Sequence, residues 1–134
     1  MRITGECHCG DITYEAVIDP EKIRVCHCTD CQTLSGSAFR TIVLSEEGAF
    51  RLLSGKVKEY IKTAESGVKR PQGFCPECGT PIFSTTQGDG PKTYSLRVGA
   101  IRERDTLVPI LQIWTRSAQH WVDGLSAIKK TPMG

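Results

Sequence analysis

The chain has 134 residues, of which 39 % are hydrophobic and 24 % are charged, and seven of them are cysteines. This composition is typical of one folded domain, and no apolar run approaches the length of a membrane span. The formal net charge is +2. If all seven thiols bind as thiolates to two divalent ions, they add seven negative charges and the ions add four positive charges, which leaves about −1. We therefore expect neither a nucleic-acid partner nor a membrane partner.

The first half of the chain predicts strands around one short helix. Ile12, Tyr14 and Ala16 alternate with polar residues, as in a half-buried strand, and Asp19-Pro20 is a turn signal. Thr29 and Gly36 suit the N-cap and the C-terminal end of a single helical turn. We expect no other helix of note.

Extended segments dominate the second half. Residues 38–44 predict a buried strand, and residues 50–53 and 57–61 predict a hairpin. Further strands are expected at 82–85 and at 94–98, where the alternation is strictest. The predicted fold class is therefore mostly β, with one antiparallel, single-domain architecture and zinc knuckles at hairpin tips.

The sequence predicts one domain followed by a short tail. We expect a zinc-binding domain at residues 1–128 and a frayed tail at 129–134. Trp114 and Trp121 are expected in the core, because tryptophan is highly buried on average.

The cysteines argue for metal rather than disulfide bonds. Residues 1–6 lack an apolar signal-peptide core, the cysteine count is odd, and a Cys-x-Cys disulfide would be strained. In a reducing compartment the same pattern indicates metal ligation, so we expect a cytoplasmic protein.

Two cysteine pairs predict one closed zinc site. Cys75-x-x-Cys78 before Gly79 is a zinc knuckle, and Cys7 and Cys9, at i and i+2 of an extended segment, point to the same side. Closing on one ion, the pairs would cross-link about 65 residues of chain, and chelation would unfold the domain. The alternative is four reduced, buried thiols.

A rival pairing would join the knuckle at 75–78 to Cys28-x-x-Cys31 as a zinc ribbon. The separation of about 43 residues exceeds the usual ribbon spacing of roughly 15–20. This pairing would also leave the three remaining thiols, Cys7, Cys9 and Cys26, without a common site.

Cys26, Cys28 and Cys31 predict an open zinc site that carries the function. Zinc with three thiolates is a poor Lewis acid, but it deprotonates an added thiol, which can then attack a small aldehyde. Alternatively, a histidine closes the site, or the three thiols hold metal weakly or not at all. The histidines that could close it are His8, His27 and His120.

Two of these histidines, His8 and His27, each stand between two cysteines. In an extended Cys-x-Cys segment the middle side chain points away from the metal. We therefore expect them to have structural roles beside the metal rather than to ligate it.

The complete pattern resembles the glutathione-dependent formaldehyde-activating enzymes, a family also named with centromere protein V. The resemblance runs from about residue 3 to residue 121. It is carried by Gly5-x-Cys7-His8-Cys9-Gly10, Cys26-His27-Cys28-x-x-Cys31, Gly36-x-x-Phe39, Phe74-Cys75-x-x-Cys78-Gly79, Gly99, Pro109 and Trp121.

The resemblance implies a β-tent fold, a structural zinc on the outer cysteine pairs and a second zinc on the central three, with a thiol cofactor near it. It also implies the joining of glutathione and formaldehyde into S-hydroxymethylglutathione, a carbon–sulfur lyase reaction when read backwards. Gln112 departs from the pattern, because many relatives have histidine there.

Our leading interpretation is a zinc-dependent, carbon–sulfur lyase-like enzyme whose partners are a small thiol and a small carbonyl compound. Cys26, Cys28 and Cys31 would act in catalysis, and Arg40, Arg70 or Arg97 would pair with a substrate carboxylate. The alternatives are a non-catalytic, zinc-stabilised binding module and a thiol-redox protein.

Overall fold

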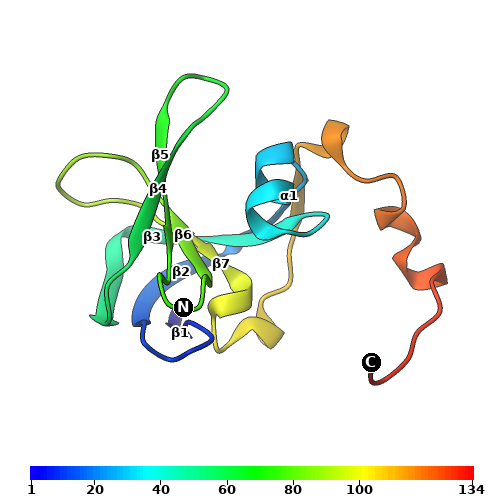
Figure 1. Cartoon of the computed structure of the whole chain (residues 1–134), viewed down its shortest axis with the longest axis horizontal. Coiled ribbons are helices and arrows are strands. Elements are labelled where there is room, and N and C mark those ends of the chain that lie inside the picture. The colour runs from blue at the N-terminus through cyan, green and yellow to red at the C-terminus, as the bar shows by residue number, and fades with distance from the viewer.

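The strands form one twisted sheet in which the order in space differs from the order along the chain (Figure 1). In the computed structural model, which describes residues 1–134, the strands are β1 (Arg2–Glu6), β2 (Thr13–Cys26), β3 (Arg40–Ser54), β4 (Lys58–Thr63), β5 (Lys69–Phe74), β6 (Pro81–Ser84), β7 (Ser95–Arg97) and β8 (Leu111–Ile113). Their order is β1-β2-β3-β7-β6-β5-β4, and β8 joins β2 in the one parallel pairing. The predicted fold class, mostly β and antiparallel, is confirmed.

One α-helix, α1 (Thr29–Ser35), follows β2 directly. Its N-cap is Cys28, whose sulfur accepts a hydrogen bond from the Cys31 backbone N–H at 3.3 Å, so the predicted Thr29 cap is wrong by one residue. Gly36 ends the helix as predicted, with a left-handed φ of 64° that glycine adopts without strain. The other helical turns are 3-10 turns at Val98–Ala100, Arg104–Thr106, Thr115–Ser117 and Val122–Ala127.

The core is built from a row of apolar side chains that crosses the sheet. Ile23, Val43, Leu96 and Phe83 are successive cross-strand partners, and all four are buried. Gly73 continues the row on β5, where a Cβ atom would lie 2.5 Å from the Phe83 ring. Glycine is therefore required at this position by the ring packed above it.

The opposite face of the same strands carries the charged side chains near the cysteines, and it holds every second residue because successive side chains alternate across a sheet. Cys26 is the partner of Arg40 on the neighbouring strand, and Arg97 is the partner of Ile42, two residues further along β3. Cys26, Arg40 and Arg97 therefore share this face. Leu34 and Ser35 of α1 line pockets together with Arg40, so the helix lies over the same face.

The predicted hairpin between residues 50–53 and 57–61 is wrong. β3 and β4 lie at separate places in the sheet, and β4 pairs with β5 instead. At the bend, Gly55 has a φ of 79°, and Ser54 Oγ donates to the Asp11 carbonyl at 3.0 Å. The chain is thus held against the β1–β2 loop and cannot fold straight back on β3.

Two further expectations differ from the structure. Asp19-Pro20 does not turn the chain, because β2 passes through it with an irregular register between Ile18 and Ile23. Trp114 and Trp121 are 45 % and 43 % exposed rather than in the core. The last segment of the chain, drawn orange to red, leads away from the sheet (Figure 1). None of the helices could cross a membrane.

Candidate metal centres

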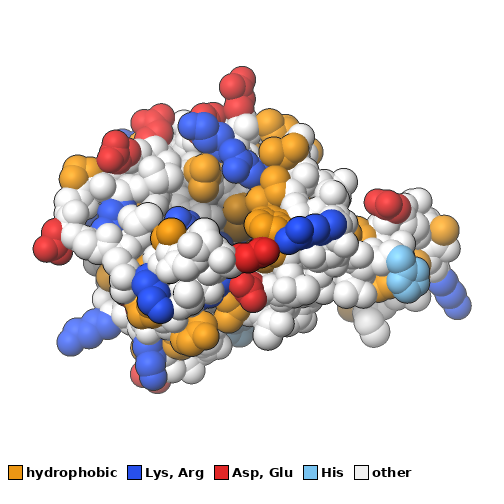
Figure 2. Space-filling model, turned by 90° about the horizontal axis from the view of Figure 1, so that it is seen from above, with side chains coloured by type: hydrophobic (Ala, Val, Ile, Leu, Met, Phe, Trp, Pro, Cys, Tyr) orange, Lys and Arg blue, Asp and Glu red, His pale blue; other side chains and the backbone are white.

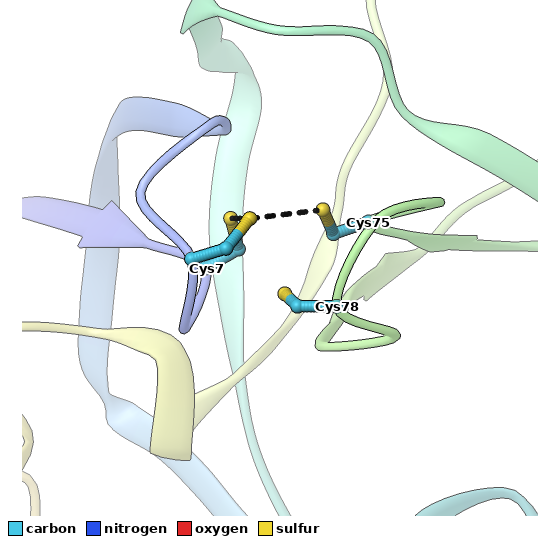
Figure 3. A group of neighbouring side chains, drawn as sticks. Cys7, Cys75 and Cys78 are labelled. Atoms are coloured by element: carbon cyan, nitrogen blue, oxygen red, sulfur yellow. Dashed lines mark hydrogen bonds between the residues drawn. The ribbon is translucent and has the colours of Figure 1, made fainter.

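Four sulfurs converge between two hairpin tips. Cys7 and Cys9 follow β1, Cys75 and Cys78 follow β5, and all four sulfurs lie within 4.8 Å of one another. Figure 3 shows Cys75 and Cys78 facing the Cys7 turn across the gap between the two loops. The structure thus brings together the two pairs that the sequence assigns to one site, and the rival ribbon pairing does not form.

Backbone hydrogen bonds shape both turns. The Cys75 N–H donates to the Thr80 carbonyl at 3.0 Å, and the Gly79 N–H donates to the Cys75 carbonyl at 2.8 Å, with Gly79 at a φ of 78°. On the other side, the Ile12 N–H donates to Cys7 Sγ at 3.2 Å. Each tight turn therefore aims its sulfurs at the facing loop.

The four-cysteine group fits a zinc ion. Zinc–sulfur bonds of about 2.3 Å in a tetrahedron place the sulfurs about 3.8 Å apart. The separations of Cys7 from Cys9, 3.5 Å, and of Cys9 from Cys75, 3.8 Å, match that edge. Hydrogen bonds from the hydroxyl and the backbone N–H of Thr80 lower the pKa of Cys78, which favours the thiolate form that metal binding requires, whereas the hydrogen bond with Cys7 and burial raise the pKa of Cys9.

The second group consists of Cys26, Cys28 and Cys31, again with all sulfurs within 4.8 Å. Cys26 ends β2, and Cys31 lies in the first turn of α1. The hydrogen bond from Cys31 lowers the pKa of Cys26, whereas that bond and burial raise the pKa of Cys31. Three soft sulfur donors suit zinc, and the group contains no histidine, aspartate or glutamate.

The histidines of the two Cys-x-Cys motifs belong to neither group. His27 is buried, its Nε2 lies 2.7 Å from Gln112 Oε1, and its ring packs edge-on against Phe39. Gln112 therefore holds His27 in place. His8 is exposed.

One residue that the sequence did not single out supports the three-cysteine turn. Gln32 Nε2 donates to the His27 carbonyl at 2.8 Å and to the Ser117 carbonyl at 2.9 Å. It therefore ties α1 to the turn before it and to the chain beyond β8. A lone glutamine in a polar helix gives no sequence signal for this role.

A pocket of about 280 Å³ adjoins the three-cysteine group; we name it the Cys28 pocket. Lys62 pairs with Asp30 at 2.9 Å, and Arg116 pairs with Glu65 at 3.4 Å and lies over the Trp114 ring. The residues that line the pocket are Cys28, Thr29, Asp30, Lys62, Ala64, Glu65, Arg70, Trp114, Arg116 and Ser117. Figure 2, seen from above, shows basic, acidic and hydrophobic side chains together around the hollowed middle of this face.

The three arginines proposed from the sequence occupy two places. Arg70 is half-buried and lines the Cys28 pocket, whereas Arg40 and Arg97 are each 7 % exposed and lie side by side deeper on the sheet. Burial, and then the charge of Arg40, lower the pKa of Arg97 to about 9, which still leaves the Arg97 guanidinium group charged at pH 7.

Comparisons with known proteins agree with this architecture. The family model described as glutathione-dependent formaldehyde-activating enzyme matches residues 2–117. A Schizosaccharomyces pombe protein named as an uncharacterized lyase is 28 % identical over 88 residues, which are 65 % of this chain and 61 % of that protein, so the chain spans less than two thirds of its relative. A crystal structure of a Rhodobacter sphaeroides protein has a TM-score of 0.60 at 18 % identity, covers 81 % of this chain and 98 % of its own, and shows a likeness of fold.

Proposed function

Because the chain belongs to the glutathione-dependent formaldehyde-activating enzyme family, we propose that it is a zinc-dependent enzyme of the carbon–sulfur lyase type. In the proposed reaction, glutathione or another thiol adds to formaldehyde or another small carbonyl compound. A bond forms between the thiol sulfur and the carbonyl carbon, the C=O double bond becomes a single bond, and the thiol proton passes to the carbonyl oxygen. No oxidant or reductant is needed.

The observation that supports this proposal is the three-sulfur group at the edge of the Cys28 pocket. Cys26, Cys28 and Cys31 would hold a zinc ion. An added thiol would be deprotonated by a zinc ion bound there, because a thiol that coordinates zinc loses its proton. Cys28 would carry the ion at the pocket wall, where a thiol from solvent has access.

The cationic side chains of the Cys28 pocket would bind an anionic thiol. Lys62 and Arg116 have acidic partners, but Arg70 has no carboxylate within 4.0 Å. Arg70 is therefore the side chain best placed to bind a carboxylate of glutathione, because a guanidinium group can donate two parallel hydrogen bonds to a carboxylate.

The four-cysteine group would hold a structural zinc. It joins two loops that are far apart in the sequence, and the sulfur set leaves no vacancy for a substrate. Metal bound there would stabilise the fold, since such a site does not exist in the unfolded chain.

The test follows adduct formation from glutathione and formaldehyde by NMR exchange spectroscopy, using protein with two zinc ions bound. The wild type should exceed the buffer rate, Cys28→Ser should lose this acceleration, and Thr33→Ala, on the exposed side of α1, should keep it. A wild-type rate equal to that of buffer at full zinc occupancy would remove the proposal. One zinc per chain without catalysis would favour the binding module, and a native disulfide within the three-cysteine group would favour the redox protein.

A further inference from the structure

Arg40 and Arg97 are buried cations without an acidic partner. Each is 7 % exposed, and no carboxylate lies within 4.0 Å of either guanidinium group. Burying an unpaired charge is costly, so proteins rarely keep one that serves no purpose. Two such charges side by side therefore indicate an anion that belongs between them.

The hydrogen bonds of this pair leave most of its donors unused. Gln72 Oε1 accepts from Arg97 at 2.7 Å and from Arg40 at 3.4 Å, and Arg97 also donates to Ser95 Oγ at 3.4 Å. Two guanidinium groups offer ten N–H donors, and the buried Arg40 Nε has no partner. The nearest acceptor that the pair uses is thus a neutral amide oxygen.

Both arginines line the same two small cavities, of about 160 and 290 Å³, which we name together the arginine pocket. One wall comes from Leu34 and Ser35 at the end of α1, and the other includes Pro81 at the start of β6. Both arginine side chains therefore border free space, while the unpaired Arg40 Nε itself is buried.

The charges of the neighbouring three-cysteine group do not remove this excess. Cys26 is the cross-strand partner of Arg40, so the two sites adjoin. Three thiolates and one divalent ion sum to about −1, whereas Arg40 and Arg97 bring two positive charges. One added monoanion would balance the whole.

We propose that Arg40 and Arg97 bind a substrate carboxylate, and that this carboxylate belongs to the carbonyl compound, a small 2-oxo acid. The inference rests on the proposed function and names its substrate class. Paired guanidinium groups match the geometry of a carboxylate, whereas formaldehyde has no charge for them to recognise.

The thiol is the other possible source of a carboxylate, but the structure favours the carbonyl compound. Arg70, on the wall of the Cys28 pocket, already offers the thiol a cation. The smaller of the two cavities at Arg40 and Arg97, of about 160 Å³, has room for a compound of a few heavy atoms.

Binding is measured first without any reaction. Oxamate, an unreactive mimic of a 2-oxo acid, is titrated into zinc-loaded protein while the arginine Nε–H signals are followed by NMR. The Arg40 Nε–H signal should shift, uncharged oxamide should leave it unchanged, and Arg97→Met should raise the Kd at least about tenfold. Arg51→Met, at an exposed arginine paired with Glu15, is the matched control and should keep the wild-type Kd.

The wild-type titration decides the site even if Arg97→Met folds poorly. Absence of any oxamate-dependent shift of the Arg40 and Arg97 signals would overturn the inference. Equal shifts with oxamide would also overturn it, because the pocket would then not recognise charge.

Kinetics then identify which substrate carries the carboxylate. With 2-mercaptoethanol as a neutral thiol, Arg97→Met should lower the ratio of kcat/KM for glyoxylate to that for formaldehyde at least about tenfold. An unchanged ratio, with loss only when glutathione replaces the neutral thiol, would assign the carboxylate to the thiol and refute the 2-oxo acid. If the wild type catalyses neither reaction, the proposed function fails, while the oxamate titration still decides the carboxylate site.

Discussion

The two cysteine groups should differ in how much stability they contribute, because they close chain loops of different length. Cys9 and Cys78 are exposed, so replacing both with serine removes one ligand from each hairpin tip with little loss of packing. Cys28→Ser with Cys31→Ser is the matched variant in the other group. Serine at position 28 keeps an N-cap for α1, since serine is among the preferred capping residues.

The magnitude follows from the loops that the metal closes. Cys9 and Cys75 are 66 positions apart, whereas Cys26 and Cys31 are five positions apart. With the loop-entropy relation for covalent cross-links, closing the longer loop stabilises the fold by about 4 kcal/mol and closing the shorter one by about 2 kcal/mol. The Cys9/Cys78 double variant should therefore lose about 2 kcal/mol more of the free energy of unfolding.

Urea unfolding at saturating zinc, followed by circular dichroism, measures this difference, and metal analysis of the same samples reports zinc content. Each double variant should bind one zinc ion per chain instead of two. If both lose the same free energy, or if the Cys28/Cys31 variant loses more, the assignment of the longer cross-link to Cys7, Cys9, Cys75 and Cys78 is refuted.

Three other predictions test the fold. Gly73→Ala should destabilise the protein by about 1–3 kcal/mol in urea unfolding because its Cβ would overlap the Phe83 ring, whereas Gly99→Ala, with no atom within 4 Å of the added Cβ, should change stability little. Burial raises the pKa of Tyr14 above its ordinary 10.0. The contribution of the neutral Tyr14 side chain to the free energy of unfolding is therefore complete below pH 10 and is lost as the pH rises further. Unfolding measured against pH should show this loss, and Tyr14→Phe should remove it. Deleting residues 129–134, which are exposed and outside any helix or strand, should change the melting temperature by no more than a typical surface substitution, and a larger drop would contradict a domain limit at 128.

Local alternation predicted most of the strands, but it missed β5 and β8 and did not show which strands are neighbours. The burial of Ile12, Tyr14 and Ala16 follows directly from period two. The hairpin predicted at 50–61 is wrong because Gly55 indicates a turn but not the strand with which the following residues pair. Contacts with the β1–β2 loop, which is distant in sequence, decide that.

The candidate site was predictable where it depends on spacing and unpredictable where it depends on strand order. Cys26, Cys28 and Cys31 lie close together because one short turn holds all three. The placement of Arg40 beside Arg97 requires β3 and β7 to be neighbours, although residues 55–94, which contain three other strands, separate these two strands along the chain. A charged residue in a strand also gives no sequence signal that it is buried.

The same strand register that fills the core also positions the site. Val43 is buried between Ile23 and Leu96, and this pairing places Arg40 opposite Cys26 on the other face. A slip of one residue between β2 and β3 would expose Val43 and turn Arg40 into the core, so apolar burial strongly opposes it. Polar contacts could not hold the arginines alone, because the pair makes only three hydrogen bonds. The unpaired cations beside the three sulfurs are therefore held in place by the hydrophobic row behind them, and their donors remain free for an anion.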